Sequence, residues 1–263
     1  MRLTQPILSL YEAYHIHLPW NRGQGVFRRA ILGLMGMGFA PPLLRGAEGI
    51  RIEFGTDVLH YELFVRQSWE PEMTEFMAGL VPRGGVVIDV GANVGYFSLL
   101  FSRWVGAEGH VYAFEPIRRT FATLQANLRA NGATNVTALK KACFSSPGEA
   151  KMLLDTDSGW SRLTTDGSGH EVVELTTIDE FVRQTGLSRV DFIKIDAEGV
   201  DFEVLRGALG TLERHRSTVL LEVLEGDQYA SSEAGVRALV APLGYEVEVV
   251  PSRWSKDVVC RPR

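Results

Sequence analysis

A glycine-containing turn between a predicted strand and a predicted helix is the segment of this sequence best suited to bind a ligand. Gly91 and Gly95 lie at the two ends of this glycine turn, and Asp89 and Asn93 supply polar side chains beside it. Glycine lets a backbone pass close to a ligand, and the N–H groups at a helix N-terminus favour negative charge. Glu115 ends the next predicted strand, where a carboxylate can accept hydrogen bonds from both hydroxyls of a ribose. Together these residues predict a nucleoside-binding site.

The spacing within the glycine turn favours S-adenosylmethionine over a nicotinamide dinucleotide. The dinucleotide fingerprint is G-x-G-x-x-G, and its second and third glycines would fall on Asn93 and Tyr96. An adenosyl ligand with an amino-acid end fits better, because the N–H groups of the turn can meet its carboxylate and Asp89 can meet its ammonium. Two alternatives stay open: a nicotinamide-dependent oxidoreductase on a Rossmann-like sheet, and a module that binds S-adenosylmethionine without catalysis.

A second group of polar residues lies at the end of a later predicted strand. Lys194 and Asp196 are two residues apart, so their side chains point to the same face. Asp196 lies at the carboxyl end of the strand, where open α/β sheets bind ligands, and Glu198 follows in the loop. We expect Asp196 or Glu198 to orient, or partly deprotonate, a substrate hydroxyl, and Lys194 to contact the substrate. No further oxygen ligand stands nearby, so we expect no metal.

An insert at residues 148–176 interrupts the regular pattern. It is rich in turn-forming residues, and polar excursions of this kind on a compact sheet are often functional. Residues 152–154 and 172–175 are predicted to pair as a hairpin. His170 lies in this insert and is the histidine we expect to serve as a general base over the substrate.

The elements that must position these residues alternate between strands and helices. Short apolar runs typical of buried strands are followed by segments of helical periodicity. This alternation predicts βαβ units and a mostly parallel sheet. The predicted strands are residues 86–90, 110–115, 136–144, 190–196, 219–224 and 245–250, and the predicted helices are residues 72–80, 94–104, 117–131, 200–212 and 234–243.

Composition excludes several classes of protein. The chain has 263 residues, of which 45% are apolar, so it can build a sizeable core and is not disordered as a whole. Its net charge of −5 argues against a nucleic-acid partner, because such domains usually present a basic face. The apolar stretch at residues 30–44 is broken by glycines and prolines, so no transmembrane segment is expected. Cys143 and Cys260 are expected to be free thiols in a reducing compartment, hence a cytoplasmic location.

Five segments carry a resemblance to a known family, in order over about residues 70–225: Val86–Phe97, Ala113–Pro116, Thr177–Phe181, Ile193–Gly199 and Val204–Ala208. With these segments the sequence resembles the FkbM-type family of S-adenosylmethionine-dependent methyltransferases. The resemblance implies an α/β, class I methyltransferase fold: a Rossmann-like, mostly parallel seven-stranded sheet with helices on both faces and an antiparallel last strand. It also implies S-adenosylmethionine as donor and O-methylation of a hydroxyl on a polyketide, sugar or other natural product.

The resemblance also implies roles for individual residues. Ala142 would lie close to the adenine, and Asp196 would face the methyl group as well as bind the cofactor. Trp160 and Arg162 depart from the small and hydroxyl residues expected there, so we expect them to shape the acceptor pocket for a flat or anionic substrate. The residues that would bind the cofactor by motif are Asp89, Gly91, Asn93, Gly95 and Glu115.

The resemblance covers the beginning of the chain poorly. We therefore predict two parts: a small N-terminal cap at residues 1–70 and a methyltransferase domain at residues 71–263. The cap is expected to contribute to acceptor choice or to the formation of a homodimer. A small-molecule acceptor is the expected partner of the methyltransferase domain.

Overall fold

The computed structural model describes residues 43–53, 59, 63, 67–154, 161–164, 169–223, 232–251 and 256–263. The chain divides into two units, Met1–Trp69 and Glu70–Arg263. In the first unit, β1 (Leu43–Arg45) and β2 (Arg51–Glu53) form an antiparallel pair joined by the short helix η2 (Ala47–Gly49). The role of this unit as a cap stays a prediction.

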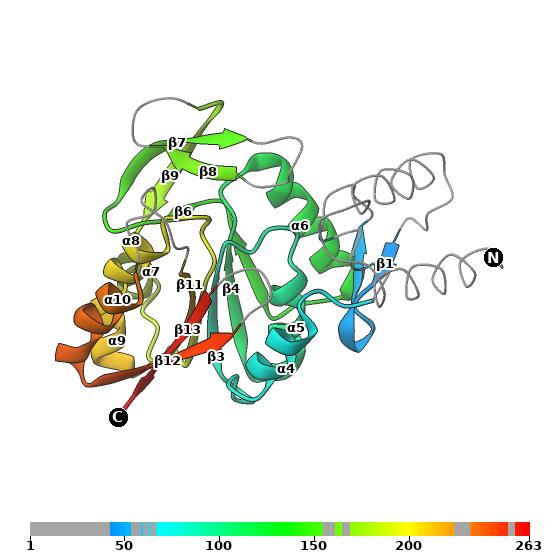
Figure 1. Cartoon of the computed structure of the whole chain (residues 1–263). Coiled ribbons are helices and arrows are strands. Elements are labelled where there is room, and N and C mark those ends of the chain that lie inside the picture. Colours follow the sequence, from blue (N-terminus) through cyan, green and yellow to red (C-terminus); the bar gives the residue numbers. More distant parts are fainter. Residues whose placement is uncertain are drawn as a thin grey trace, which may run out of the picture. The chain divides into compact units, whose positions relative to one another are not determined.

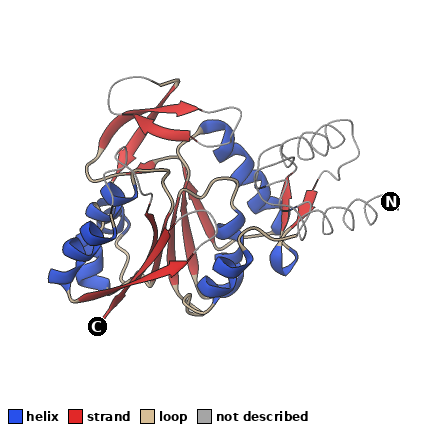
Figure 2. Ribbon diagram, in the orientation of Figure 1, coloured by secondary structure: helices blue, strands red, loops and turns tan. Residues whose placement is uncertain are grey.

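Seven strands form the central sheet of the second unit, in the order β12-β13-β11-β10-β3-β4-β5 (Figures 1 and 2). The pairs from β11 through β10, β3 and β4 to β5 are parallel, whereas β13 is antiparallel to both of its neighbours. The predicted sheet is thereby confirmed. Its strands are β3 (Val86–Val90), β4 (His110–Phe114), β5 (Val136–Leu139), β10 (Phe192–Ile195), β11 (Thr218–Val223), β12 (Tyr245–Pro251) and β13 (Lys256–Pro262).

Helices cover both faces of this sheet (Figure 1). One face carries α4 (Pro71–Ala78), α5 (Tyr96–Val105) and α6 (Arg118–Asn131). The other carries α7 (Ile178–Thr185), α8 (Asp201–Arg206), α9 (Leu209–His215) and α10 (Glu233–Val240), which is followed by the short helix η3 (Ala241–Leu243). None of the helices in the described part of the chain is long and apolar enough to cross a membrane.

The alternation of side chains along the central strands assigns each residue to one face. Ile193 and Ile195 of β10 pack into the large apolar core that also contains residues of α7, α8, α9 and α10. Phe192 and Lys194 point to the opposite face, where Phe192 contacts Phe101 of α5 and Lys194 lies over another α5 ring. Polar residues of the central strands are therefore collected beneath α5.

Two predicted elements are divided in the structure. The strand predicted at residues 136–144 ends at Leu139, and Ala142–Cys143 form a separate strand, β6, in another sheet. The helix predicted at residues 200–212 breaks into α8 and α9 at Gly207, where an added Cβ would lie 2.1 Å from the Phe144 carbonyl oxygen. Both corrections arise from close approach of distant segments, which local periodicity does not encode.

The insert folds into a second, four-stranded sheet ordered β6-β9-β7-β8. It contains β7 (Gly148–Leu154), β8 (Ser161–Thr164) and β9 (Glu171–Thr176). The predicted hairpin is correct only in part, because β9 pairs with residues 148–152 of β7, while residues 152–154 pair with β8. β8 was not predicted, because its residues follow directly on the turn-forming residues of the insert and include no apolar run.

Candidate active site

The register of the central sheet brings Asp89 and Lys194 together. They are direct partners in the parallel pair of β3 and β10, so both side chains point to the same face. Two residues of α5 confirm which face this is. The hydroxyl of Ser98 donates to Asp89 Oδ2 at 2.5 Å, and Lys194 Nζ lies 5.1 Å from the centre of the Phe97 ring. A buried acid and a buried base therefore lie side by side beneath α5.

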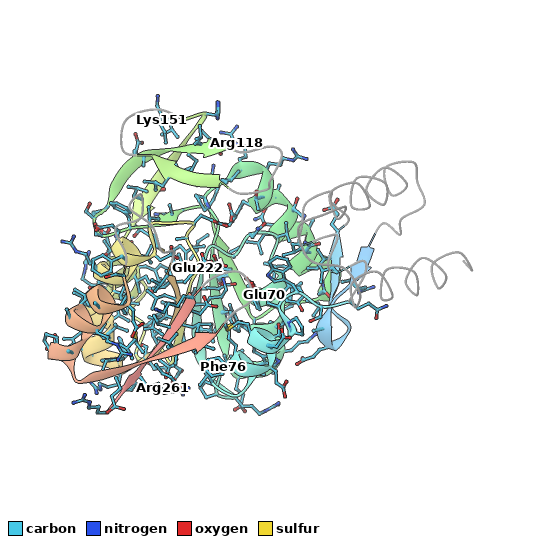
Figure 3. All side chains as sticks on the ribbon, in the orientation of Figure 1. Glu70, Phe76, Arg118, Lys151, Glu222 and Arg261 are labelled. Atoms are coloured by element: carbon cyan, nitrogen blue, oxygen red, sulfur yellow. The ribbon has the colours of Figure 1, made fainter. Side chains whose placement is uncertain are left out.

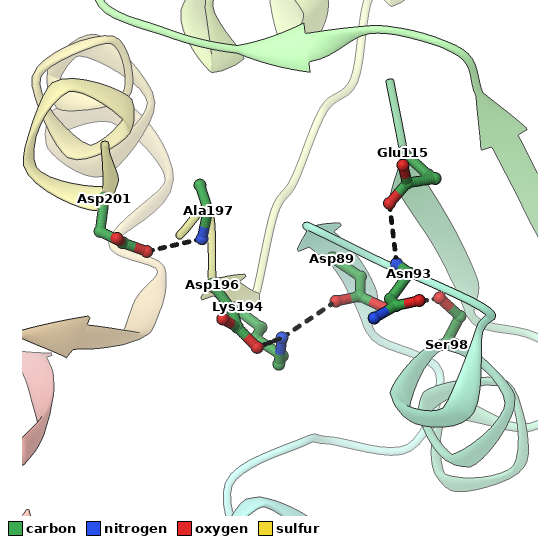
Figure 4. A network of polar contacts seen from close by, with 8 residues as sticks. All are labelled: Asp89, Asn93, Ser98, Glu115, Lys194, Asp196, Ala197 and Asp201. Carbon is green, nitrogen blue, oxygen red and sulfur yellow. Dashed lines mark hydrogen bonds and ion pairs between the residues drawn. The ribbon is translucent and has the colours of Figure 1, made fainter. Parts of the chain in front are cut away.

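The ammonium of Lys194 joins two carboxylates (Figure 4). Its Nζ lies 2.9 Å from Asp196 Oδ2 and 3.8 Å from Asp89 Oδ1. The exposed fraction of the three side chains rises from 0% at Asp89 through 6% at Lys194 to 42% at Asp196. Asp196 is therefore the end of this chain of charges that a ligand can reach.

Burial and pairing act in opposite directions on these buried groups. Burial raises the pKa of Asp89 above its ordinary value, although Lys194 and the Ser98 hydroxyl oppose the shift. Burial lowers the pKa of Lys194, but the carboxylates of Asp196 and Asp89 outweigh it, so the pKa of the ammonium is raised. Lys194 therefore stays charged at every physiological pH.

Close packing explains both glycines of the glycine turn. Gly91 and Gly95 have left-handed φ angles of +76° and +91°. A Cβ on Gly91 would lie 1.8 Å from the carbonyl oxygen of Asp196, and one on Gly95 would lie 2.5 Å from Leu124 Cδ1 of α6. The turn thus packs against the end of β10 and against α6, which sets it beside Asp196. Asn93, between the two glycines, is also left-handed, with φ of 50°.

Glu115 follows β4 and supports the glycine turn. Its carboxylate accepts hydrogen bonds from the backbone N–H of Asn93 at 3.1 Å and of Ile117 at 2.9 Å. The residue is only 5% exposed, and burial raises its pKa to about 7, against the effect of the two backbone hydrogen bonds. A carboxylate offers about four acceptor positions, so two bonds leave it able to accept ligand hydroxyls as well.

The loop after β10 contains two more perturbed carboxyls. Glu198 has a left-handed φ of 52°, and burial together with Asp196 raises its pKa to about 8. Asp201 accepts hydrogen bonds from the backbone N–H of Ala197 at 2.7 Å and of Gly199 at 3.0 Å, and burial raises its pKa to about 6. Asp201 therefore shapes the loop that presents Asp196 and Glu198.

Sequence reasoning missed Glu70, which directly precedes α4 (Figure 3). It is half-buried, with a left-handed φ of 43°, and burial raises its pKa to about 7. The charges of Asp196 and Asp257 add to this rise, and that of Lys194 opposes it, so Glu70 lies within electrostatic range of the Lys194–Asp196 pair. No local pattern marks Glu70, because its proximity depends on how α4 packs.

Four further predicted residues, in β6 and in the insert, have different outcomes. Ala142 is buried in β6. His170 is exposed, and its backbone N–H donates to the Met152 carbonyl at 2.8 Å. Trp160 lies outside the described residues, and Arg162 is described only as a backbone position in β8. The roles of these four residues stay predictions.

The start of β9 nevertheless lies near the glycine turn. Glu171 accepts a hydrogen bond from the backbone N–H of Arg118 at 3.0 Å, and its charge contributes to the raised pKa of Glu115. The small sheet is thus next to the carboxyl end of β4. Across the described ranges, no three His, Cys, Asp or Glu residues are grouped so that they could hold a metal ion.

Comparison with known proteins identifies relatives in one enzyme class. Methyltransferase sdnD of Sordaria araneosa is 26% identical over 67% of this chain and 80% of its own length. Hexuronic acid methyltransferase AglP of Haloferax volcanii is 30% identical over 65% of this chain and 72% of its own length. The crystal structure of methyltransferase FkbM from Methylobacillus flagellatus aligns with a TM-score of 0.52 at 18% identity.

The alignment to that crystal structure covers 77% of this chain and 52% of the other, so the chain spans about half of the solved protein, and the likeness concerns the fold. The family model for the Methyltransferase FkbM domain matches residues 89–247, which include the glycine turn, Glu115 and the segment around Asp196. The family predicted from the motifs is confirmed: the chain belongs to the FkbM family and is a methyltransferase.

Proposed function

We propose that this enzyme transfers a methyl group from S-adenosylmethionine to a hydroxyl of a small molecule. The observation that carries the proposal is Glu115. This carboxylate is buried just after β4 and is hydrogen-bonded to the glycine turn. Its oxygens can accept further hydrogen bonds. A ribose diol held at that point would place the rest of the nucleoside along the carboxyl edge of the sheet.

The residues around Glu115 fit this donor. Beside it, the turn from Gly91 to Gly95 ends at the N-terminus of α5, where backbone N–H groups suit a carboxylate. Gly91, Asn93, Gly95 and Glu115 would hold the donor, and Ala142 would lie close to its adenine.

Asp196 has the position and charge of a general base. When bound, S-adenosylmethionine would supply an electrophilic methyl group on a sulfonium. The half-exposed carboxylate of Asp196 would orient the acceptor hydroxyl and take up its proton. Glu198, whose pKa is about 8, holds a proton at neutral pH and can donate a hydrogen bond to the acceptor. A positioned base contributes roughly 10²–10⁴-fold to such a step.

Relatives support a small-molecule acceptor. One relative is named for methylation of a hexuronic acid, which carries sugar hydroxyls. Family membership argues against the nicotinamide-dependent alternative. The other alternative, a module that only binds S-adenosylmethionine, predicts binding without turnover. We also propose a cytoplasmic location, because Cys143 and Cys260 are both free thiols.

The test combines binding with product analysis. Calorimetry with S-adenosylmethionine and S-adenosylhomocysteine should show binding by the wild type and by a Glu213→Gln control on the exposed side of α9. Transfer from methyl-labelled donor to a panel of sugars, uronic acids, polyketide-type alcohols and amines should then give a methyl ether located by mass spectrometry. Failure to bind either nucleoside, or methylation of nitrogen or of a carboxylate only, would overturn the proposal.

A further inference from the structure

Lys194 was expected to contact the substrate, but its surroundings assign it another role. Its side chain is only 6% exposed and lies over the Phe97 ring, with its ammonium 3.8 Å from Asp89 and 2.9 Å from Asp196. Asp196, at 42% exposure, is the accessible member of its pair with Lys194 (Figure 4). An acceptor that reaches this edge of the sheet therefore meets the carboxylate before the ammonium.

Asp196 depends on Lys194 for its orientation. Within the described part of the chain, Lys194 Nζ is the hydrogen-bond donor to the Asp196 carboxylate, at 2.9 Å. The other titratable groups in this region are carboxyls: Glu70 before α4, Asp89 of β3, and Glu198 and Asp201 after β10. None of them can attract the Asp196 carboxylate by an opposite charge, so the ammonium is the group that holds it in one place.

Asp89 makes this arrangement stable. An unpaired ammonium in a buried strand would be strongly unfavourable. Asp89 has no exposed surface, one oxygen is held by Ser98, and the other faces the ammonium at 3.8 Å. Asp89 is therefore placed as the buried counter-ion of the Lys194 ammonium.

We propose that Lys194 is a positioning residue, which Asp89 neutralises from within and which holds the catalytic carboxylate of Asp196 without touching the acceptor. The inference rests on the proposed function for the role of Asp196. It also revises the expectation for Asp89, which would pair with Lys194 instead of meeting the donor ammonium. Lys194 thereby links the strand that precedes the glycine turn to the base at the end of β10.

A charge-neutral exchange of the buried pair tests this assignment. Lys194→Met leaves the buried Asp89 carboxylate without its ammonium, and Asp89→Asn leaves the buried Lys194 ammonium with Asp196 as its one carboxylate of the two. The double variant removes both buried charges and keeps the side-chain volumes similar. Lys194→Arg keeps the charge, and Arg237→Met breaks an exposed pair with Glu233 on α10 as a control. Each protein is examined by urea unfolding, by calorimetry with S-adenosylhomocysteine, and by crystallography.

We expect both single variants to unfold at lower urea concentration than the wild type and the double variant to recover most of the loss. The double variant should bind S-adenosylhomocysteine within about threefold of the wild type. Its Asp196 carboxylate should leave the position seen here, whereas Lys194→Arg should keep it there. A Lys194 with a merely structural role would leave Asp196 in place in the double variant, and that result would overturn the proposal.

A different result would assign Asp89 to the donor. If Asp89→Asn weakens S-adenosylhomocysteine binding tenfold or more and the double variant does not recover it, Asp89 contacts the nucleoside and the pairing argument is wrong. Failure of the proposed function is distinguishable, because the wild type would then bind neither nucleoside. The recovery on unfolding and the position of Asp196 would still decide the role of Lys194.

Discussion

Replacing Glu115 by glutamine changes one buried charge and keeps its shape. In the wild type, the carboxylate accepts backbone N–H bonds from Asn93 and Ile117. An amide has one acceptor oxygen, so one of the two backbone donors loses its partner and faces an N–H₂ group. A buried donor left unpaired costs about 1–3 kcal/mol. Against this loss, the variant no longer has to bury a negative charge.

The pH dependence of stability separates the two effects. Burial raises the pKa of Glu115 from 4.5 to about 7, so the folded protein holds this proton more tightly than the unfolded chain. The stabilisation from this group is complete below pH 4.5 and is lost as the pH rises through 7. The difference corresponds to about 3 kcal/mol, since a tenfold change in proton affinity is worth about 1.4 kcal/mol. Glu115→Gln lacks this loss.

Urea unfolding of wild type and Glu115→Gln between pH 4.5 and 8.5 measures this difference. We expect the free energy of unfolding of the variant, relative to the wild type, to rise by about 3 kcal/mol across this range. Other carboxyls titrate in the same range, but their contributions cancel in the comparison of the two proteins. Glu213→Gln removes an exposed charge and should show no such trend. Parallel curves for wild type and Glu115→Gln would refute the argument from burial.

The same variant tests the ribose contact. If the ionised carboxylate accepts ribose hydroxyls, Glu115→Gln should weaken S-adenosylhomocysteine binding by about 100-fold, the equivalent of one or two charge-assisted hydrogen bonds. Wild-type affinity should also fall as the pH drops below 7, because the carboxyl is then protonated, and the variant should lack this dependence. An unchanged affinity at pH 8 would refute the assignment of Glu115 to the donor.

Three further predictions concern the frame around the site. Gly91→Ala should lower the free energy of unfolding by about 3 kcal/mol in urea, because its Cβ would lie 1.8 Å from the Asp196 carbonyl oxygen. Gly132 has open space around it, so Gly132→Ala should cost only about 1 kcal/mol, which comes from its left-handed φ. Asp179→Ala should cost about 1–2 kcal/mol, since its carboxylate accepts the first N–H groups of α9, and it should leave S-adenosylhomocysteine affinity unchanged. Burial raises the pKa of Cys143, and that of Cys260 to about 12, so neither thiol should react with Ellman's reagent at pH 8 until urea unfolds the protein.

Local pattern and spacing were enough to predict the sheet and its glycine turn from the sequence. Strands such as β3 are buried on both faces and therefore read as continuous apolar runs, and each is followed by a helix of ordinary length. The position of Glu115 beside the glycine turn could be predicted because an acid at the end of the second strand must lie beside the turn that follows the first. These relations involve only elements that follow one another in the sequence, so they can be predicted from the order of residues along the chain.

Contacts between distant segments were decided by the tertiary structure alone. The register that places Lys194 opposite Asp89, rather than one residue away, depends on how β10 inserts beside β3. Glu70 approaches Asp196 only because α4 packs against the same face. The break at Gly207 likewise depends on a carbonyl from another loop. The sequence by itself therefore determined the fold, the family and the acidic residue beside the glycine turn. The charge pairing that orients the proposed base was set by packing, because charges act through space and the order of residues does not record distance.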